Sequence, residues 1–153
     1  MLFRSLLLFN YVDKHGTVLY DMLNKSVKDG RKVFFIHGGT DVEDREEIRR
    51  ILEKETNAIL VGSVGVLSTG TNIVALSNII FASPSKSKIR NLQSIGRGLR
   101  VSDTKQSATL FDLADDFSWK KRENFTLKHF FERLKTYTEE KFKFKLYKIQ
   151  IKD

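Results

Sequence analysis

Short apolar runs alternate with helical patterns over the first two-thirds of the chain. Five runs of nearly continuous apolar character are candidate strands, and they cover residues 6–11, 33–36, 58–61, 78–82 and 108–113. Runs without polar alternation are typical of strands that are covered on both faces, as in a parallel sheet. Because helical segments separate them, the pattern predicts βαβ units and therefore an α/β domain built on a central parallel sheet.

Two helices are expected between the first three strands. The first has apolar residues at helical spacing over 18–23, and Gly30 stands where its C-terminal end would be closed. The second is expected to begin at a capping box formed by Thr40 and Glu43. It carries an apolar stripe over 48–52, opposite charged residues. Both patterns are typical of helices that cover a sheet.

The pattern changes in the last part of the chain. After a polar connection, residues 127–134 form a strongly amphipathic helical pattern, and apolar residues over 142–146 alternate with lysines as in an edge strand. The aromatic stripe of this helix is interpreted as packing rather than as a ligand site. The sequence therefore predicts a three-layer α/β domain over 1–117. A small helix–strand extension over 118–153 is expected to pack on that domain or on a neighbouring one.

Composition narrows the class of protein. The chain has 153 residues, of which 41% are hydrophobic, and this is enough apolar material for one domain with a proper core. The absence of Cys excludes disulfides and thiolate metal sites, and the three scattered His residues predict no structural metal. No apolar run approaches the roughly 20 residues needed to cross a bilayer. The first apolar stretch is interpreted as a buried strand rather than a signal peptide, so we expect a cytoplasmic protein without a membrane partner.

The charge balance favours a polyanionic partner. The formal net charge is +8 and the sequence pI is about 9.7. Neutralising phosphates releases condensed counterions, so a basic protein gains affinity for nucleic acid. Many basic proteins bind no nucleic acid, however, and the charge alone leaves this partner open.

The segment over 93–100 carries the most specific chemistry. On a helix, Gln93, Gly96, Arg97 and Arg100 fall on one face at i, i+3, i+4 and i+7. The two arginines begin roughly 4.5 Å apart along the axis, so both can converge on one polyphosphate. Gly96 and Gly98 each cost about 1 kcal/mol relative to Ala inside a helix. Their presence indicates that another group approaches the backbone closely there. The alternative is that these arginines are structural residues on a surface helix.

This octapeptide resembles motif VI of superfamily-two helicases, the pattern Gln-x-x-Gly-Arg-x-x-Arg. Upstream, the Gly-, Ser- and Thr-rich segment 61–73 follows a strand and resembles motif V of the same superfamily. The turn after the second strand, together with Arg45, is similar to motifs IV to IVa, although a turn or capping role for His37 and a helix-holding role for Arg45 stay open. The matches run in the family's order from residue 6 to about residue 117.

The resemblance implies a RecA-like fold of the P-loop NTPase type and a place as the second such domain of a helicase. It implies that Arg97 and Arg100 are catalytic and reach the γ-phosphate of ATP as arginine fingers. Other residues implied to bind the nucleotide are Gly70, Asn72, Gln93 and Gly96. Residues implied to contact the nucleic acid are His37, Gly38, Gly39, Ser63, Ser68, Thr69, Lys86 and Lys88.

Within the superfamily, the segments 67–73, 86–88 and 108–113 are similar to phage UvsW-type and related DNA helicases. This similarity favours DNA over RNA and a phage or bacterial source. In two places the chain departs from DEAD-box RNA helicases: motif VI begins with Gln rather than His, and Val64 stands where those enzymes often carry a phosphate-binding Thr. The adjacent acids Asp115 and Asp116 are interpreted as capping or solvent-facing residues rather than a metal site.

Two motifs of the family are missing from this chain. It has no Gly-x-x-x-x-Gly-Lys-Ser/Thr loop and no acidic strand motif of the Asp-Glu-x-His type. ATP and Mg²⁺ are therefore expected to be bound mainly by an N-terminal RecA-like domain, in cis or in trans. The expected function is that of half an ATP-dependent DNA helicase, which is inactive alone. A non-catalytic RecA-like nucleic-acid-binding module is the alternative, and a Rossmann-like domain is disfavoured because no Gly-x-Gly-x-x-Gly follows the first strand.

Overall fold

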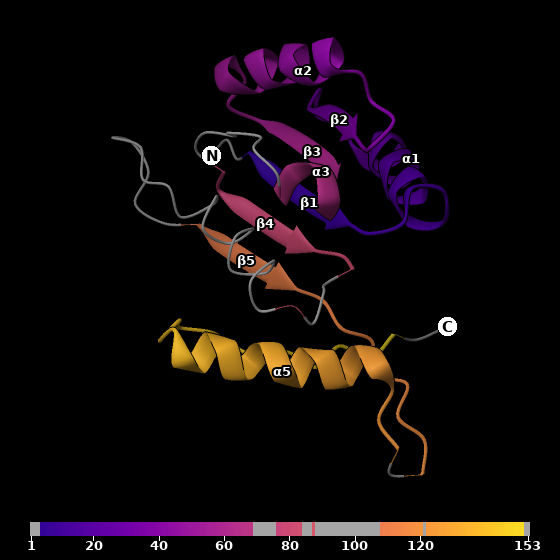
Figure 1. Cartoon of the computed structure of the whole chain (residues 1–153), viewed down its shortest axis with the longest axis vertical. Coiled ribbons are helices and arrows are strands. Elements are labelled where there is room, and N and C mark those ends of the chain that lie inside the picture. The colour runs from indigo at the N-terminus through magenta and orange to yellow at the C-terminus, as the bar shows by residue number, and fades with distance from the viewer. Residues whose placement is uncertain (1–3, 69–75, 84–86, 88–107, 121, 152–153) are drawn as a thin grey trace. The chain divides into compact units, whose positions relative to one another are not determined.

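The computed structural model describes residues 4–68, 76–83, 87, 108–120 and 122–151. The chain forms two compact units, Met1–Leu113 and Ala114–Asp153. The first unit contains a sheet with helices beside it, and the second contains one long helix with the segments that flank it (Figure 1).

The first unit is built on a five-stranded parallel sheet with the strand order β2-β3-β1-β4-β5. Its strands are β1 (Ser5–Phe9), β2 (Lys32–Ile36), β3 (Ala58–Ser63), β4 (Asn78–Phe81) and β5 (Thr109–Asp112). Each of the five nearly continuous apolar runs of the first unit contains a strand, and the prediction of a parallel sheet is confirmed. The interior strand β3 is buried along its whole length, as a strand covered on both faces must be.

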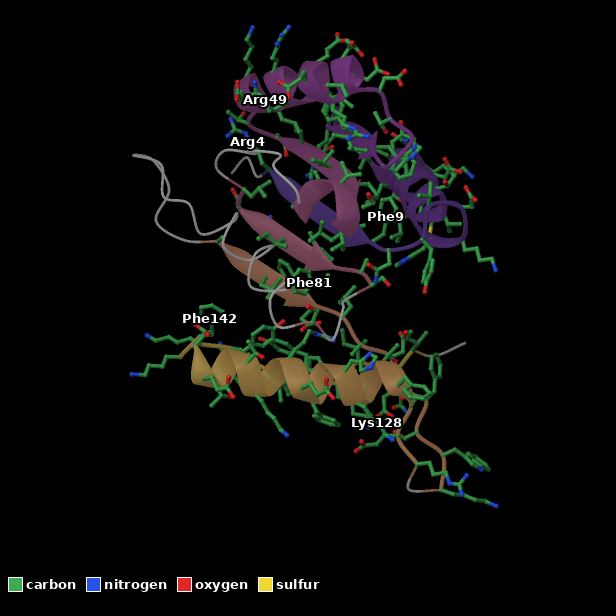
Figure 2. The ribbon with its side chains drawn as sticks, in the orientation of Figure 1. Arg4, Phe9, Arg49, Phe81, Lys128 and Phe142 are labelled. Carbon is green, nitrogen blue, oxygen red and sulfur yellow. The ribbon has the colours of Figure 1, made fainter. Side chains whose placement is uncertain are left out.

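Helices lie on both faces of this sheet. The π-helical turn η1 (Val12–Gly16) and α1 (Thr17–Ser26) follow β1, and their apolar side chains pack with a cluster of Phe9, Ile59 and Val61. Phe9 points toward this side of the sheet (Figure 2). Because the chain moves across the sheet in the opposite direction after β2, right-handed crossovers place α2 (Val42–Lys54) and α3 (Val64–Ser68) on the other face.

The end of α1 differs from the expectation. The helix ends at Ser26, where the N–H of Val27 donates to the carbonyl of Leu23 at 2.9 Å. Gly30 lies beyond the helix, in the turn before β2, and adopts a left-handed φ of 75°. Glycine is needed there for the turn, so the prediction that it closes the helix was wrong.

The start of α2 also differs from the expectation. Asp41 is the N-cap residue, and no side-chain capping hydrogen bond forms. The hydroxyl of Thr40 instead accepts the N–H of His37 at 3.0 Å. The capping box predicted from Thr40 and Glu43 was therefore wrong, because the preceding turn competes for the same hydroxyl group.

The second unit contains α5 (Phe125–Glu139), which confirms the predicted amphipathic helix. The edge strand predicted over 142–146 does not form, and residues 142–151 pair with no strand in the described part of the chain. The N–H of Phe142 donates to the carbonyl of Tyr137 at 2.9 Å. The rings of Phe142 and Phe144 lie 6.2 and 6.4 Å from the ring of Tyr137. The alternating aromatic side chains thus pack on the helix instead of lining the face of a strand.

Candidate functional site

The carboxyl edge of the sheet brings together polar residues that are distant in the sequence. Ligands bind in open α/β sheets outside the carboxyl ends of the strands. The register pairs Phe9 with Ser63 and Ile36 with Gly62, so β1, β2 and β3 end at the same level. Asn10 and His37 follow directly after two of these strands, and Ser63 ends the third. Three elements therefore deliver short polar groups to one edge.

The turn after β2 is held by its own side chains. The Nδ1 atom of His37 accepts the N–H of Gly39 at 3.1 Å, and the N–H of Thr40 donates to the carbonyl of His37 at 3.1 Å. A Cβ atom on Gly39 would lie 3.1 Å from the imidazole Cε1. The imidazole thus takes the turn role that was considered for it, while Gly38 and Gly39 stay exposed. The turn presents peptide backbone rather than side chains to any ligand.

Arg45 fastens this turn to α2. Its Nη2 atom donates to the carbonyl of His37 at 3.3 Å and to that of Gly38 at 3.0 Å. Both acceptors are backbone carbonyls of this turn, so the guanidinium stabilises the turn. Its geometry corresponds to the helix-holding alternative rather than to a direct ligand contact, and it fixes the two glycines relative to the first turn of α2.

Ser63 and α3 are positioned by a close approach of helix and strand. Gly62 precedes Ser63 in β3, and a Cβ atom at this position would overlap Cδ1 of Leu67 and lie 3.0 Å from its Cγ. Because Leu67 is only 2% exposed, α3 rests on the bare backbone of β3. Ser63 is itself 8% exposed, and the helix that follows it ends at Ser68. The close contact of Leu67 with Gly62 therefore fixes the start of α3 at the carboxyl edge of the sheet.

Asn10 and Ser83 join the site, although the sequence reasoning did not find them. The Nδ2 atom of Asn10 donates to the carbonyl of Ser83 at 2.7 Å and to its Oγ at 3.1 Å. This pair ties the carboxyl end of β1 to that of β4, since Leu8 pairs with Phe81. An Asn after one strand and a Ser after another are ordinary loop residues. The strand register, counted from the two apolar runs, is the signal that would have placed them together.

The residues implied to touch ATP cannot be placed at this edge from the described residues. The predicted site residues outside the described part of the chain are Thr69, Gly70, Asn72, Lys86, Lys88, Gln93, Gly96, Arg97 and Arg100. They stay predictions. The connection that carries Arg97 and Arg100 follows β4 and precedes β5, which run parallel.

Metal-ligating side chains do not gather in the described residues, where no group of three or more His, Cys, Asp or Glu could hold an ion. One side chain of the acidic pair caps a turn, since Asp116 Oδ1 accepts the N–H of Ser118 at 3.1 Å. Within the same part of the chain, no helix combines the length and the apolar character that crossing a bilayer requires.

Comparison with known proteins identifies the family. Residues 4–102 match the helicase conserved C-terminal domain. The chain is 33% identical over 150 residues to the ATP-dependent DNA helicase uvsW of Enterobacteria phage T4, covering 92% of this chain and 29% of the relative. The crystal structure of T4 UvsW superposes with a TM-score of 0.70 at 32% identity, over 91% of this chain and 29% of that one.

A more distant solved structure shares only the fold. Domain 2 of the DEAD-box helicase Mss116p, bound to an RNA duplex, has a TM-score of 0.63 at 18% identity, over 74% of this chain and 43% of that one. The RecA-like architecture expected from the motifs is therefore confirmed. The chain spans 29% of the length of the curated relative that it matches. Because the family match covers more than half of its residues, the chain belongs to the helicase conserved C-terminal domain family.

Proposed function

We propose that this chain is the second RecA-like domain of an ATP-dependent DNA helicase or translocase. One observation carries the proposal: the turn at His37 and the residue Ser63, which come from two helicase-like motifs, lie at the same carboxyl edge of the sheet. The family match over 4–102 contains both segments, and also the segment with Arg97 and Arg100. A relative named as an ATP-dependent DNA helicase supports DNA as the nucleic acid.

The chain's own donors suit phosphates and ribose rather than a metal ion. Arg97 and Arg100 carry guanidiniums, while Asn72 and Gln93 carry amides. Guanidiniums pair with phosphate oxygens in a fixed planar geometry. ATP and Mg²⁺ would therefore be held mainly by a second RecA-like domain, in cis or in trans, and ATP hydrolysis there would supply the free energy. In this arrangement Arg97 and Arg100 stabilise charge that develops on the transferring phosphoryl group.

The same edge would contact the nucleic-acid backbone. Exposed peptide groups at Gly38 and Gly39, together with short hydroxyl groups, are suited to phosphate and sugar contacts that carry no sequence information. The further members of this proposed contact set are Ser63, Ser68, Thr69, Lys86 and Lys88. Opening and closing of two RecA-like domains would then move this edge along a DNA strand.

The decisive experiment alters the arginines in the full-length protein. We expect Arg97→Ala or Arg100→Ala to lower DNA-stimulated ATP turnover by at least roughly a hundredfold, because a supplied arginine is worth about 10³ to 10⁵ in rate and the remaining one compensates in part. Nucleotide affinity should fall far less. Lys substitutions should rescue poorly, since an ammonium group cannot reproduce the planar fork.

Arg49 offers a matched control, because this half-buried arginine of α2 pairs with Glu46 at 2.9 Å and stands outside the proposed site (Figure 2). Arg49→Ala should leave ATP turnover unchanged. If an Arg97 or Arg100 variant kept near-normal turnover while its thermal stability fell, that arginine would be structural. Normal turnover in both variants would favour a non-catalytic nucleic-acid-binding module.

A further inference from the structure

The second unit presents a tight turn with an exposed tryptophan. Trp119, the only tryptophan of the chain, is 73% exposed. Its N–H donates to the carbonyl of Arg122 at 3.0 Å, and the N–H of Arg122 donates back to the carbonyl of Trp119 at 2.9 Å. The two residues form an antiparallel bridge that closes a two-residue turn. A single exposed apolar residue needs no explanation, but here two backbone hydrogen bonds hold the main chain from which the ring projects.

The base of the turn is fastened to the start of α5. The Nδ2 atom of Asn124 donates to the carbonyl of Asp115 at 2.8 Å, and its Oδ1 atom accepts the N–H of Phe117 at 3.0 Å. The hydroxyl of Thr126 donates to the same carbonyl of Asp115 at 3.1 Å. These bonds join the two arms of the turn, which project beyond the end of the helix (Figure 1). The chain on either side of the turn is therefore joined to the start of α5 by three side-chain hydrogen bonds.

Asp116, which precedes the first arm of the turn, already has polar partners. Hydrogen bonds from Ser118 hold the pKa of the Asp116 carboxyl below its usual value, and attraction to Lys148 acts in the same direction. The Nζ atom of Lys148 lies 3.5 Å from this carboxylate. Asp116 thus stays ionised and caps the arm, and Lys148 offsets its charge.

The turn is strongly basic. Three consecutive basic residues, Lys120, Lys121 and Arg122, follow Trp119, and the nearest acids along the chain are Asp116 and Glu123. The Nζ atom of Lys120 lies 5.9 Å from the centroid of the Trp119 ring. Lys120 also adopts a left-handed φ of 45°, where two-residue hairpin turns favour Asn or Gly. The geometry of the turn therefore does not favour lysine at this position.

We propose that this turn binds single-stranded nucleic acid, with the Trp119 ring stacking on a base and Lys120 and Arg122 pairing with the adjacent phosphates. The inference rests on the proposed function, which supplies nucleic acid as the ligand. Proteins that hold single strands without sequence preference combine aromatic platforms with basic side chains in this way. An acidic protein surface would satisfy the cations, but it would offer no flat partner for the exposed ring.

The test uses the full chain and an oligothymidylate of about 12 nucleotides at low salt, within the site sizes of single-strand-binding proteins. Because Trp119 is the only tryptophan, quenching of tryptophan fluorescence reports contact at the turn alone. Anisotropy of the labelled oligonucleotide reports all binding. We expect both signals to give the same Kd. Trp119→Ala should weaken binding roughly 5- to 150-fold, the range for loss of one stacked base, and Trp119→Phe should retain most of the affinity.

Two further variants separate a binding role from a structural one. Tyr147→Ala removes a ring that is 78% exposed but lies outside the turn, and it should leave the Kd unchanged. Lys120→Asn removes a charge and introduces a residue that tolerates a left-handed φ. It should weaken binding and lower the salt slope by about one, while the thermal midpoint is kept or raised. A turn with only a structural role would gain stability without losing affinity.

The outcomes distinguish this inference from the function on which it rests. Oligonucleotide binding without quenching, together with an unchanged Kd for Trp119→Ala, would overturn the role of the turn and leave the proposed function intact. Absence of any binding at the lowest salt would count against both. Quenching by polyglutamate but not by the oligonucleotide would assign the turn to an acidic protein partner. Normal ATP turnover in both arginine variants, with quenching retained, would overturn the proposed function alone.

Discussion

Gly62→Ala is the sharpest test of how the sheet positions the candidate site. The added methyl group would overlap Cδ1 of Leu67 and lie 3.0 Å from its Cγ. Leu67 is buried, so its side chain has no free space into which to turn. Overpacking of this kind costs about 1–3 kcal/mol, while removing a glycine from a strand returns about 0.5–1 kcal/mol. We therefore expect a net loss of stability on the order of 1–2 kcal/mol.

Urea unfolding followed by far-UV circular dichroism measures this loss as a lower midpoint with an unchanged slope. Leu67→Ala alone should cost about 2–5 kcal/mol, because it leaves a cavity. In the Leu67→Ala background, however, Gly62→Ala should cost nothing or stabilise the protein, since the obstructing side chain is gone. The two substitutions should therefore be coupled by at least about 1 kcal/mol. DNA affinity of the single Gly62→Ala variant should also fall, because α3 and Ser63 are displaced together.

Gly38→Ala is the matched control for stability. A Cβ atom at Gly38 would meet no atom within 4 Å, so this substitution should change stability by less than about 0.5 kcal/mol. If Gly62→Ala were equally neutral, or if its effect simply added to that of Leu67→Ala, the close packing of α3 on β3 would be refuted. The account of how Ser63 is held at the edge would then fail with it.

Three other outcomes follow from the site. The chain alone should hydrolyse ATP at background rate with or without DNA, and turnover that survives repurification would contradict the half-enzyme interpretation. Its DNA affinity should fall steeply as the salt concentration rises, because counterion release drives phosphate binding. An affinity that does not change with salt would mean that the net charge contributes to solubility and not to DNA binding. Arg45→Met should speed amide exchange at Thr40 and weaken DNA binding, since the turn loses two charge-assisted hydrogen bonds worth about 1 kcal/mol or more in total. An unchanged rate of amide exchange at Thr40 would show that Arg45 does not stabilise the turn.

The sheet could be predicted from the sequence because strands that are buried on both faces need runs of nearly continuous apolar residues. A strand such as β3, which is buried throughout, has to be apolar at nearly every position, and the run 58–61 shows this. The ends of helices are harder to predict, because a short polar side chain can hydrogen-bond either to the helix or to the adjacent turn. Thr40 matched a helix cap, but its hydroxyl bonds to the turn instead. Gly30 matched a helix end, but it serves the following turn.

Partners in space are harder to predict than patterns along the chain. The alternation over 142–146 indicates an extended backbone, but it does not say whether a strand or a helix receives the aromatic face, and Tyr137 of α5 does so here. The contact of Asn10 with Ser83 joins residues 73 positions apart, and neither belongs to a recognisable motif. By contrast, the motif-bearing turn at His37 and Ser63 could be assigned to one edge, because each stands within two residues of the end of a predicted strand.

The proposed DNA contacts of this chain are of two physical kinds, which differ in how their contribution to affinity depends on salt concentration. At the carboxyl edge, the proposed contacts include Lys86 and Lys88, whose charges would neutralise phosphates, so affinity there would depend on displaced counterions. At the basic turn, the Trp119 ring would add stacking, which releases no counterions. Trp119→Ala should therefore lower affinity by the same factor at every salt concentration, whereas Lys120→Asn should lower it most at low salt. A loss in Trp119→Ala that vanished at high salt would mean that the ring acts only by placing the neighbouring cations.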